Sequence, residues 1–163
     1  MANTQAMCTS FMQQLMVGEH QLGTATLVSR TSLTAPTTDT LKAALYLTSA
    51  TVNAATTAYS ASNEVSGTGY AAGGVTVTNA TAPNSTNTTA TAGVAFFTPS
   101  ASIIYTTVTL TTAFDAVLLY NSTQSNKAIS VHTFGSQTVT AGTFTLTMPS
   151  NTTSAALIRL ATT

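Results

Sequence analysis

Residues 113–149 constrain the fold of this chain most strongly, because they read as three successive β-strands joined by two tight connections. In the last of these strands, 142–149, apolar side chains alternate with threonines, which is the pattern of a strand with one buried and one solvent-exposed face. The first strand, 114–121, carries apolar side chains on both faces, so we expect it to lie centrally in a sheet between two layers. Polar residues 122–127 and the pair Gly135-Ser136 are the predicted connections.

The rest of the chain adds further strands, which are predicted from short apolar runs bounded by Gly, Pro, Asn and Ser. These strands are 24–30, 40–48, 75–79, 93–98, 102–110 and 154–162. In the last of them Arg159 shares a face with Leu157, which predicts an edge strand whose charge opposes pairing with another sheet. With about eight strands in all, the expected fold is all-β, a β-sandwich or jelly-roll-like domain over residues 24–163. Residues 1–23 are expected to form an N-terminal helix or arm.

Residues 4–17 are predicted to be helical, because Met7, Phe11 and Leu15 recur every four residues and form an apolar stripe. A helix in this position is expected to begin at an N-cap and to end near a glycine. The candidate N-caps are Asn3 and Thr4, and the candidate stop is Gly18.

Two roles are open for this helix. Either it covers one end of the sheets within its own chain, which we favour, or it acts as an arm that binds a neighbouring subunit. In the second case Phe11, Met12 and Met16 are the contact residues, because methionine side chains adapt to the surface of a partner.

The chain has very few charged residues and a large excess of threonine. Four Lys and Arg residues balance four Asp and Glu residues, whereas threonine occurs thirty-eight times. The basic residues are scattered, so we expect no binding to nucleic acid. Threonine favours strands and tolerates water, and it gives sheet surfaces without charge. Such surfaces can pack against other subunits without burying ions.

The single cysteine, Cys8, cannot form a disulfide within the chain and gives no support for an oxidising compartment. The first residues lack the pattern of a secretion signal, and no apolar run is long enough to span a membrane. We therefore expect neither export nor a membrane partner.

Two segments are expected to lack regular structure. Residues 52–74 contain four glycines and are predicted to form a loop, with a short extended piece around Tyr70. Within this loop GTGYAAGG does not have the Lys-Ser/Thr ending or the strand-to-helix setting of a phosphate-binding loop. Residues 80–93 are predicted to be a polar linker or surface loop.

Few residues in this sequence are suited to catalysis or metal binding. His132 and Ser130 lie on the same predicted strand, and Asp115 lies on a neighbouring one, but a serine near a histidine carries little information in a chain so rich in hydroxyls. We therefore expect His132 to be a structural residue bonded to a strand neighbour. Glu19 and His20 supply only two ligands where a metal site needs three or four. The sequence predicts no enzyme activity, no cofactor and no metal.

Several ordered segments of the chain resemble small virion proteins of tailed bacteriophages. They are a helix ending in a Gly-x-His turn (FMQQLMVGEHQLG), a Lys-x-Ala-Leu-Tyr segment, a Glu-Val-x-Gly-x-Gly-Tyr loop, a Tyr-Asn-x-x-x-x-Asn-Lys hairpin and a Thr-Val-x-Ala-Gly-Thr-Phe strand. The resemblance covers most of the chain except residues 80–93. It implies a structural component of the particle, with capsid decoration favoured and a neck or tail position as the alternative.

This resemblance implies a location on the virion after assembly in the host cytoplasm, with the major capsid protein or other virion proteins as partners. A homo-oligomer, preferably a trimer, is expected. The candidate contacts are Phe11, Met12 and Met16 of the helix together with Gly69 and Tyr70 of the glycine-rich loop. A receptor- or carbohydrate-binding module, with Tyr59 and Tyr70 as sugar contacts, is a different possibility, although tryptophan is absent.

Overall fold

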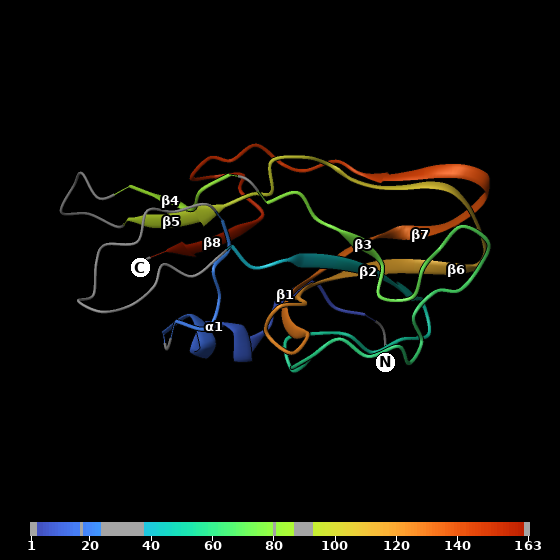
Figure 1. Cartoon of the computed structure of the whole chain (residues 1–163), viewed down its shortest axis with the longest axis horizontal. Helices are drawn as coiled ribbons and strands as arrows, with labels where there is room; N and C mark the ends of the chain where they lie inside the picture. The colour runs from blue at the N-terminus through green and yellow to red at the C-terminus, as the bar shows by residue number, and fades with distance from the viewer. Residues whose placement is uncertain (1–2, 17, 24–37, 80, 87–92, 162–163) are drawn as a thin grey trace.

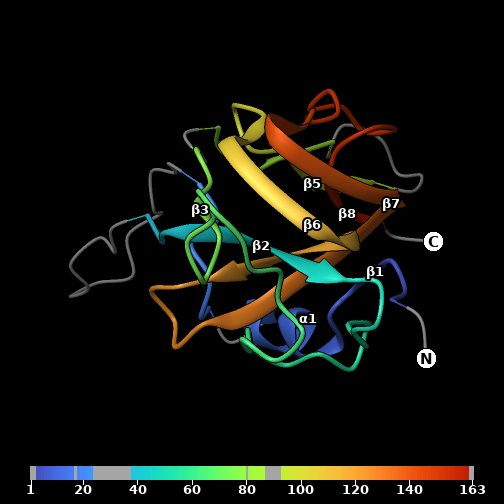
Figure 2. The same cartoon turned by 90° about the vertical axis from the view of Figure 1, so that its right-hand side faces the viewer.

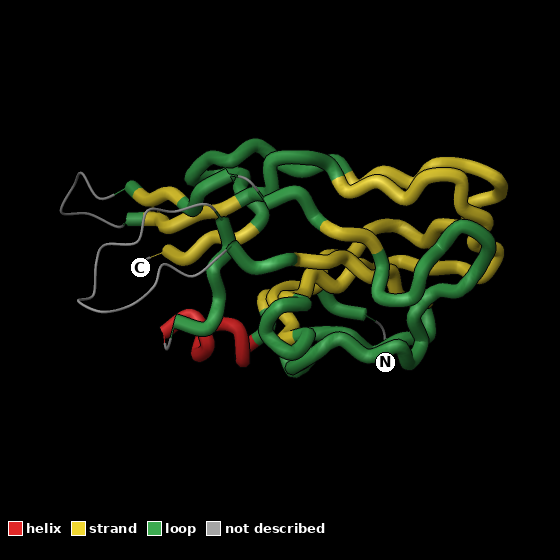
Figure 3. Tube along the Cα trace, viewed as in Figure 1, coloured by secondary structure: helices red, strands yellow, loops and turns green. Residues whose placement is uncertain are grey.

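The computed structural model describes residues 3–16, 18–23, 38–79, 81–86 and 93–161. Its elements are β1 (Ala6–Met7), α1 (Thr9–Met16), β2 (Leu41–Leu47), β3 (Val75–Thr76), β4 (Asn84–Ser85), β5 (Val94–Phe97), β6 (Ile103–Asn121), β7 (Lys127–Leu146) and β8 (Ile158–Ala161). They form a five-stranded antiparallel sheet in the order β1-β7-β6-β2-β3 and a three-stranded one in the order β4-β5-β8 (Figure 1). The chain is thus an all-β domain with a short N-terminal helix, as the sequence predicts (Figure 3).

The long hairpin of β6 and β7 dominates the larger sheet. The predicted turn after residue 121 is confirmed, since Asn121 pairs with Lys127 across it. The second predicted turn, at Gly135-Ser136, is wrong because β7 continues through it. Ala116 pairs with Thr133 and Phe114 with Gln137, so β7 has two more residues than β6 between these pairs. The Gly-Ser pair therefore lies in a β-bulge, which bends a strand without ending it.

Strand β6 likewise joins two predicted strands, 102–110 and 114–121, into one. Further register shifts interrupt the β6–β7 ladder between Tyr105 and Ala116. Because bulges increase the local bend and twist, the hairpin folds back over itself, and its two halves face each other (Figures 1 and 2).

The core lies between these two halves and around the centre of the larger sheet. Residues 116–121 of β6 lie between β7 and β2 and are all buried, which confirms the prediction of a central strand with two covered faces. Phe144 from the outer half of β7 packs edge-on against Phe114, with ring centroids 5.0 Å apart. Phe134 lies 5.3 Å from Phe144, so aromatic contacts close the folded hairpin.

The N-terminal helix begins later than predicted. Ala6 and Met7 pair with Val131 and Ser130 as β1, so α1 begins only at Thr9. Asn3 is not an N-cap, because its side chain bonds to the backbone of residues 47 and 52. The backbone N–H groups of Thr4 and Cys8 donate to the carbonyls of Val52 and Ile129, so they are bonded to a loop and to the sheet and not within an extra turn of helix. The predicted stop is confirmed, since Gly18 follows α1 with φ of 77°.

The smaller sheet differs from the prediction at β4 and at β8, since β8 covers only Ile158–Ala161 of the predicted 154–162. Residues 84–85, predicted to lie in a polar linker, pair with β5 as β4. Strand β8 lies at the edge of this sheet, as the position of Arg159 predicts. Strands β2 and β5 are confirmed, whereas β3 is shorter than the predicted 75–79. The predicted strand 24–30 lies outside the described residues.

Candidate functional site

The predicted contact residues of the helix have different environments. Phe11 is completely buried and packs edge-on against His20, with ring centroids 4.9 Å apart. It therefore lies in the core of its own chain, and it is not free to bind a partner in this structure. Met12 is 41% exposed. The Met16 side chain lies outside what the structure describes.

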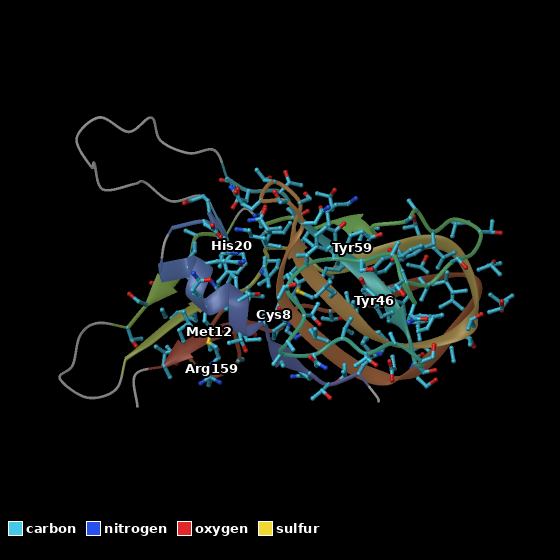
Figure 4. The ribbon with its side chains drawn as sticks, turned by 90° about the horizontal axis from the view of Figure 1, so that it is seen from below. Cys8, Met12, His20, Tyr46, Tyr59 and Arg159 are labelled. Carbon is cyan, nitrogen blue, oxygen red and sulfur yellow. The ribbon has the colours of Figure 1, made fainter. Side chains whose placement is uncertain are left out.

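An apolar groove separates α1 from the smaller sheet. Leu15 of the helix lines one side, and Phe96 of β5 and Leu160 of β8 line the other. The groove has a volume of about 210 Å³. Leu160 is 39% exposed, and Arg159 on the same strand donates to the Ser154 carbonyl at 3.2 Å. Figure 4 shows Met12 and Arg159 at the same end of the molecule, away from Tyr46 and Tyr59.

The glycine-rich loop is organised around one buried carboxylate. Glu64 accepts hydrogen bonds from the hydroxyls of Tyr59 (2.6 Å) and Tyr70 (2.7 Å) and from the backbone N–H of Gly73 (2.8 Å). The Tyr70 hydroxyl also accepts from the N–H of Leu45 in β2 at 3.0 Å. Burial and the neighbouring carboxylate raise the pKa of both phenols. These groups stay protonated at neutral pH and fix the loop to the sheet.

The same bonds determine what Tyr59, Gly69 and Tyr70 can contact. One face of Tyr59 stacks on Tyr120 at 4.8 Å, and Tyr70 stacks on Tyr105 at 5.9 Å. Gly69 has φ of 79°, and a Cβ there would lie 2.3 Å from the backbone oxygen of residue 107. The loop thus lies close against β6, with an isolated bridge between residues 68 and 109 in place of the extended piece predicted around Tyr70. Tyr59 and Tyr70 use their hydroxyls inside this network, which does not favour a sugar-binding platform.

A second polar network joins the turn after α1 to the hairpin. The side-chain amide of Asn121 donates to His20 Nδ1 (2.9 Å) and to Asp39 Oδ2 (2.6 Å). With Nδ1 as an acceptor, His20 Nε2 donates to Gln14 Oε1 at 2.9 Å. Burial lowers the pKa of His20 more than Asp39 raises it. Glu19 next to it forms an ion pair with Lys127.

The structure does not assemble a catalytic triad from the residues that the sequence offers. His132 Nε2 is bonded to Ser130 Oγ at 2.8 Å, as expected for a histidine bonded to a strand neighbour. Asp115 instead accepts a hydrogen bond from the Asn3 side chain. Burial lowers the pKa of His132 to about 4.

In the part of the chain that the structure describes, no three His, Cys, Asp or Glu side chains lie together as a metal site would need. Cys8 is buried, and burial raises the pKa of its thiol to about 11, so the thiol is protonated at neutral pH. Among the same residues, no helix has the length and apolar character required to cross a bilayer.

The sequence did not indicate the networks around Glu64 and Asn121. Tyr59, Glu64 and Tyr70 lie close together in the sequence, but this spacing alone does not predict hydrogen bonds between them. Their polar atoms meet because the loop lies close to β2. Comparisons of the chain with protein-family models, with curated proteins and with solved structures found no match.

Proposed function

We propose that this chain is a structural protein of a tailed-bacteriophage virion and that it decorates the outer surface of the capsid. It binds the major capsid protein, forms a symmetric oligomer for which a trimer is the preferred form, and stabilises the shell. It is assembled in the cytoplasm of the host and carries out no catalytic step. The ordered resemblance to small virion proteins supports this assignment, with a neck or tail position as the alternative.

The observation that carries the proposal is the way the chain removes charge from its surface. Seven of its eight charged residues lie in the described ranges. Asp39 and Glu64 are buried in hydrogen-bond networks, and Glu19 pairs with Lys127. The other three are Lys42, Asp115 and Arg159, so the described surface carries few charges and no cluster of one sign. Burying such a surface against neighbouring subunits avoids the large cost of desolvating isolated ions.

We assign to the shell the apolar groove, with the exposed Leu160 in its wall, and the exposed Met12 of α1 at the same end of the molecule. Exposed apolar side chains next to a groove are typical of a protein-binding surface. Closed cyclic symmetry suits this role, because each copy in a ring then makes the same contacts.

The test is to add purified protein to phage particles that lack it and to sediment them. We expect the protein to sediment with the particles, in hundreds of copies, and image reconstruction to show it on the shell. About a dozen copies or fewer, located at one vertex, would place it in the neck or tail instead. A protein that stays in the supernatant as a monomer would overturn the proposal altogether.

A further inference from the structure

A second cavity lies where the folded hairpin closes on itself. Its walls come from both halves of the hairpin and from the segment before β8, and they include Val117, Phe134, Leu146 and Leu157. The volume is about 150 Å³, and most of the lining is apolar. It is separate from the groove beside α1, since the two share no lining residue.

A histidine side chain lines this apolar space. His132 lines the cavity, and its Nε2 is bonded to Ser130 Oγ. Its Nδ1 has no hydrogen-bond partner among the described residues. Thr133 and Thr147 are the other polar lining residues. Nδ1 is not among the fully buried atoms that lack a partner, so it keeps accessible surface, and a ligand in the cavity can supply its hydrogen bond.

The tautomer of His132 decides whether Nδ1 donates or accepts. If the Ser130 hydroxyl donates to Nε2, then Nδ1 carries the proton; if Nε2 donates to Ser130, then Nδ1 is an acceptor. A hydroxyl group can satisfy either form, because it both donates and accepts. A carbonyl or an ammonium group can satisfy only one of them.

The size and charge of the cavity restrict the rest of the ligand. An engineered apolar cavity of about 150 Å³ in another protein binds benzene, so this volume suits a single aromatic ring. No Asp, Glu, Lys or Arg lies among the lining residues. Burial keeps the His132 ring neutral at pH 7 by lowering its pKa to about 4. An ionic ligand would lose its hydration here without gaining a counter-charge.

We propose that this cavity is a binding site for a small neutral aromatic alcohol, with the ring between the two halves of the hairpin and the hydroxyl bonded to Nδ1 of His132. This site does not depend on the proposed role in the virion. It assigns a binding function to a histidine whose other ring nitrogen is bonded to Ser130 on the same strand.

The probes are phenol and toluene, which have the same number of non-hydrogen atoms and differ by a hydroxyl in place of a methyl group. Their affinities are measured by ligand-observed NMR titration of the full chain. Toluene leaves water more readily than phenol, so the informative quantity is the ratio of the two affinities in different variants. In His132→Phe we expect this ratio to fall about three- to tenfold in favour of toluene.

Two further measurements keep the test decisive. Leu157→Trp fills the cavity, so it should abolish the binding of both probes while the circular dichroism spectrum stays unchanged. If His132→Phe does not fold, the double variant Ser130→Ala/His132→Phe removes the stranded hydroxyl. The ¹⁵N shift of His132 Nδ1 in the unmodified protein should also move with phenol and not with toluene.

The site assignment is overturned if neither probe binds up to its solubility limit, or if Leu157→Trp leaves binding unchanged. A ratio that does not change in His132→Phe, or an Nδ1 shift that does not respond to phenol, would equally reject the role of His132.

Discussion

All five tyrosines of the chain donate a hydroxyl hydrogen bond, two to Glu64 and three to backbone carbonyls. Two of these bonds cross between the glycine-rich loop and the larger sheet, since Tyr46 donates to the carbonyl of residue 60 and Tyr120 donates to that of Gly73. A third crossing bond is accepted by the Tyr70 hydroxyl, from a backbone N–H of β2. Hydrogen bonds from single side chains thus hold the loop to the sheet, where a strand would have used backbone hydrogen bonds. Each buried donor and acceptor in this network needs its partner.

Replacing Glu64 by glutamine should therefore destabilise the protein, although the two side chains have nearly the same shape. The carboxylate accepts from three donors, and the amide would place an NH₂ group against one of them. We expect the free energy of unfolding to fall by about 1–3 kcal/mol, because a buried donor is left without an acceptor. Urea denaturation at pH 7 measures this change.

Tyr59→Phe and Tyr70→Phe are matched controls for that experiment. Both variants remove a hydroxyl that bonds to Glu64, but the Tyr70 hydroxyl also accepts from the N–H of Leu45. Tyr70→Phe should therefore cost more than Tyr59→Phe, by about 1 kcal/mol. Equal stabilities for all three variants and the unmodified protein would show that Glu64 does not hold the loop.

His132 gives a prediction for the dependence of stability on pH. Its pKa is 6.5 in the unfolded chain and about 4 in the folded one, where burial opposes the charge. Between these values only the unfolded chain binds the extra proton, so stability falls as the pH decreases from 6.5 to 4. The contribution is at most about 1.4 kcal/mol per pH unit.

This slope is measured by urea denaturation at several pH values in that range. Burial also lowers the pKa of His20, so the comparison is with His132→Phe, which should show a shallower slope. Identical slopes for the two proteins would mean that His132 is protonated as readily in the folded state as in the unfolded one.

At the scale of elements, alternation and turn chemistry predicted most strands but not how they join. A Gly-Ser pair is compatible with a turn and with a bulge, and only the register against β6 decides for a bulge. The start of the helix was also not predictable from local patterns. Its apolar spacing was correct for residues 9–16, but pairing of residues 6–7 with β7 determined where it begins.

The glycine-rich loop allows the close approach to β6 to be tested. In Gly69→Ala the new Cβ would lie 2.3 Å from the backbone oxygen of Thr107, and the residue would keep a φ of 79° that alanine disfavours. We expect a loss of more than about 2 kcal/mol in the free energy of unfolding. Gly135→Ala is the control, because a Cβ there meets nothing within 4 Å. A similar loss in both variants would show that glycine acts only through chain flexibility and not through the close contact.

For the whole molecule, the sequence predicted the fold class and the low surface charge, but it identified the candidate surface only in part. Helical spacing placed Phe11 and Met12 on one stripe, yet the packing of α1 buries the first and exposes the second. Leu160 was not among the predicted contacts. It lies near α1 only because β8 pairs with β5 and forms one wall of the groove. Such a surface depends on contacts between distant segments, which local patterns do not contain.

The surface assigned to the capsid makes a final prediction at this scale. Leu160→Lys places a charge beside the apolar groove, so binding to particles should weaken about tenfold or more, because an apolar contact is lost and an ion must be desolvated. Stability should hardly change, since the side chain is 39% exposed. Ile104→Lys is the matched control, because Ile104 is 47% exposed on the hairpin, away from the groove. Co-sedimentation of both variants with particles measures the difference. If Ile104→Lys weakens binding and Leu160→Lys does not, the chain contacts its neighbours through the part of the hairpin around Ile104, and the groove beside α1 is not the docking surface.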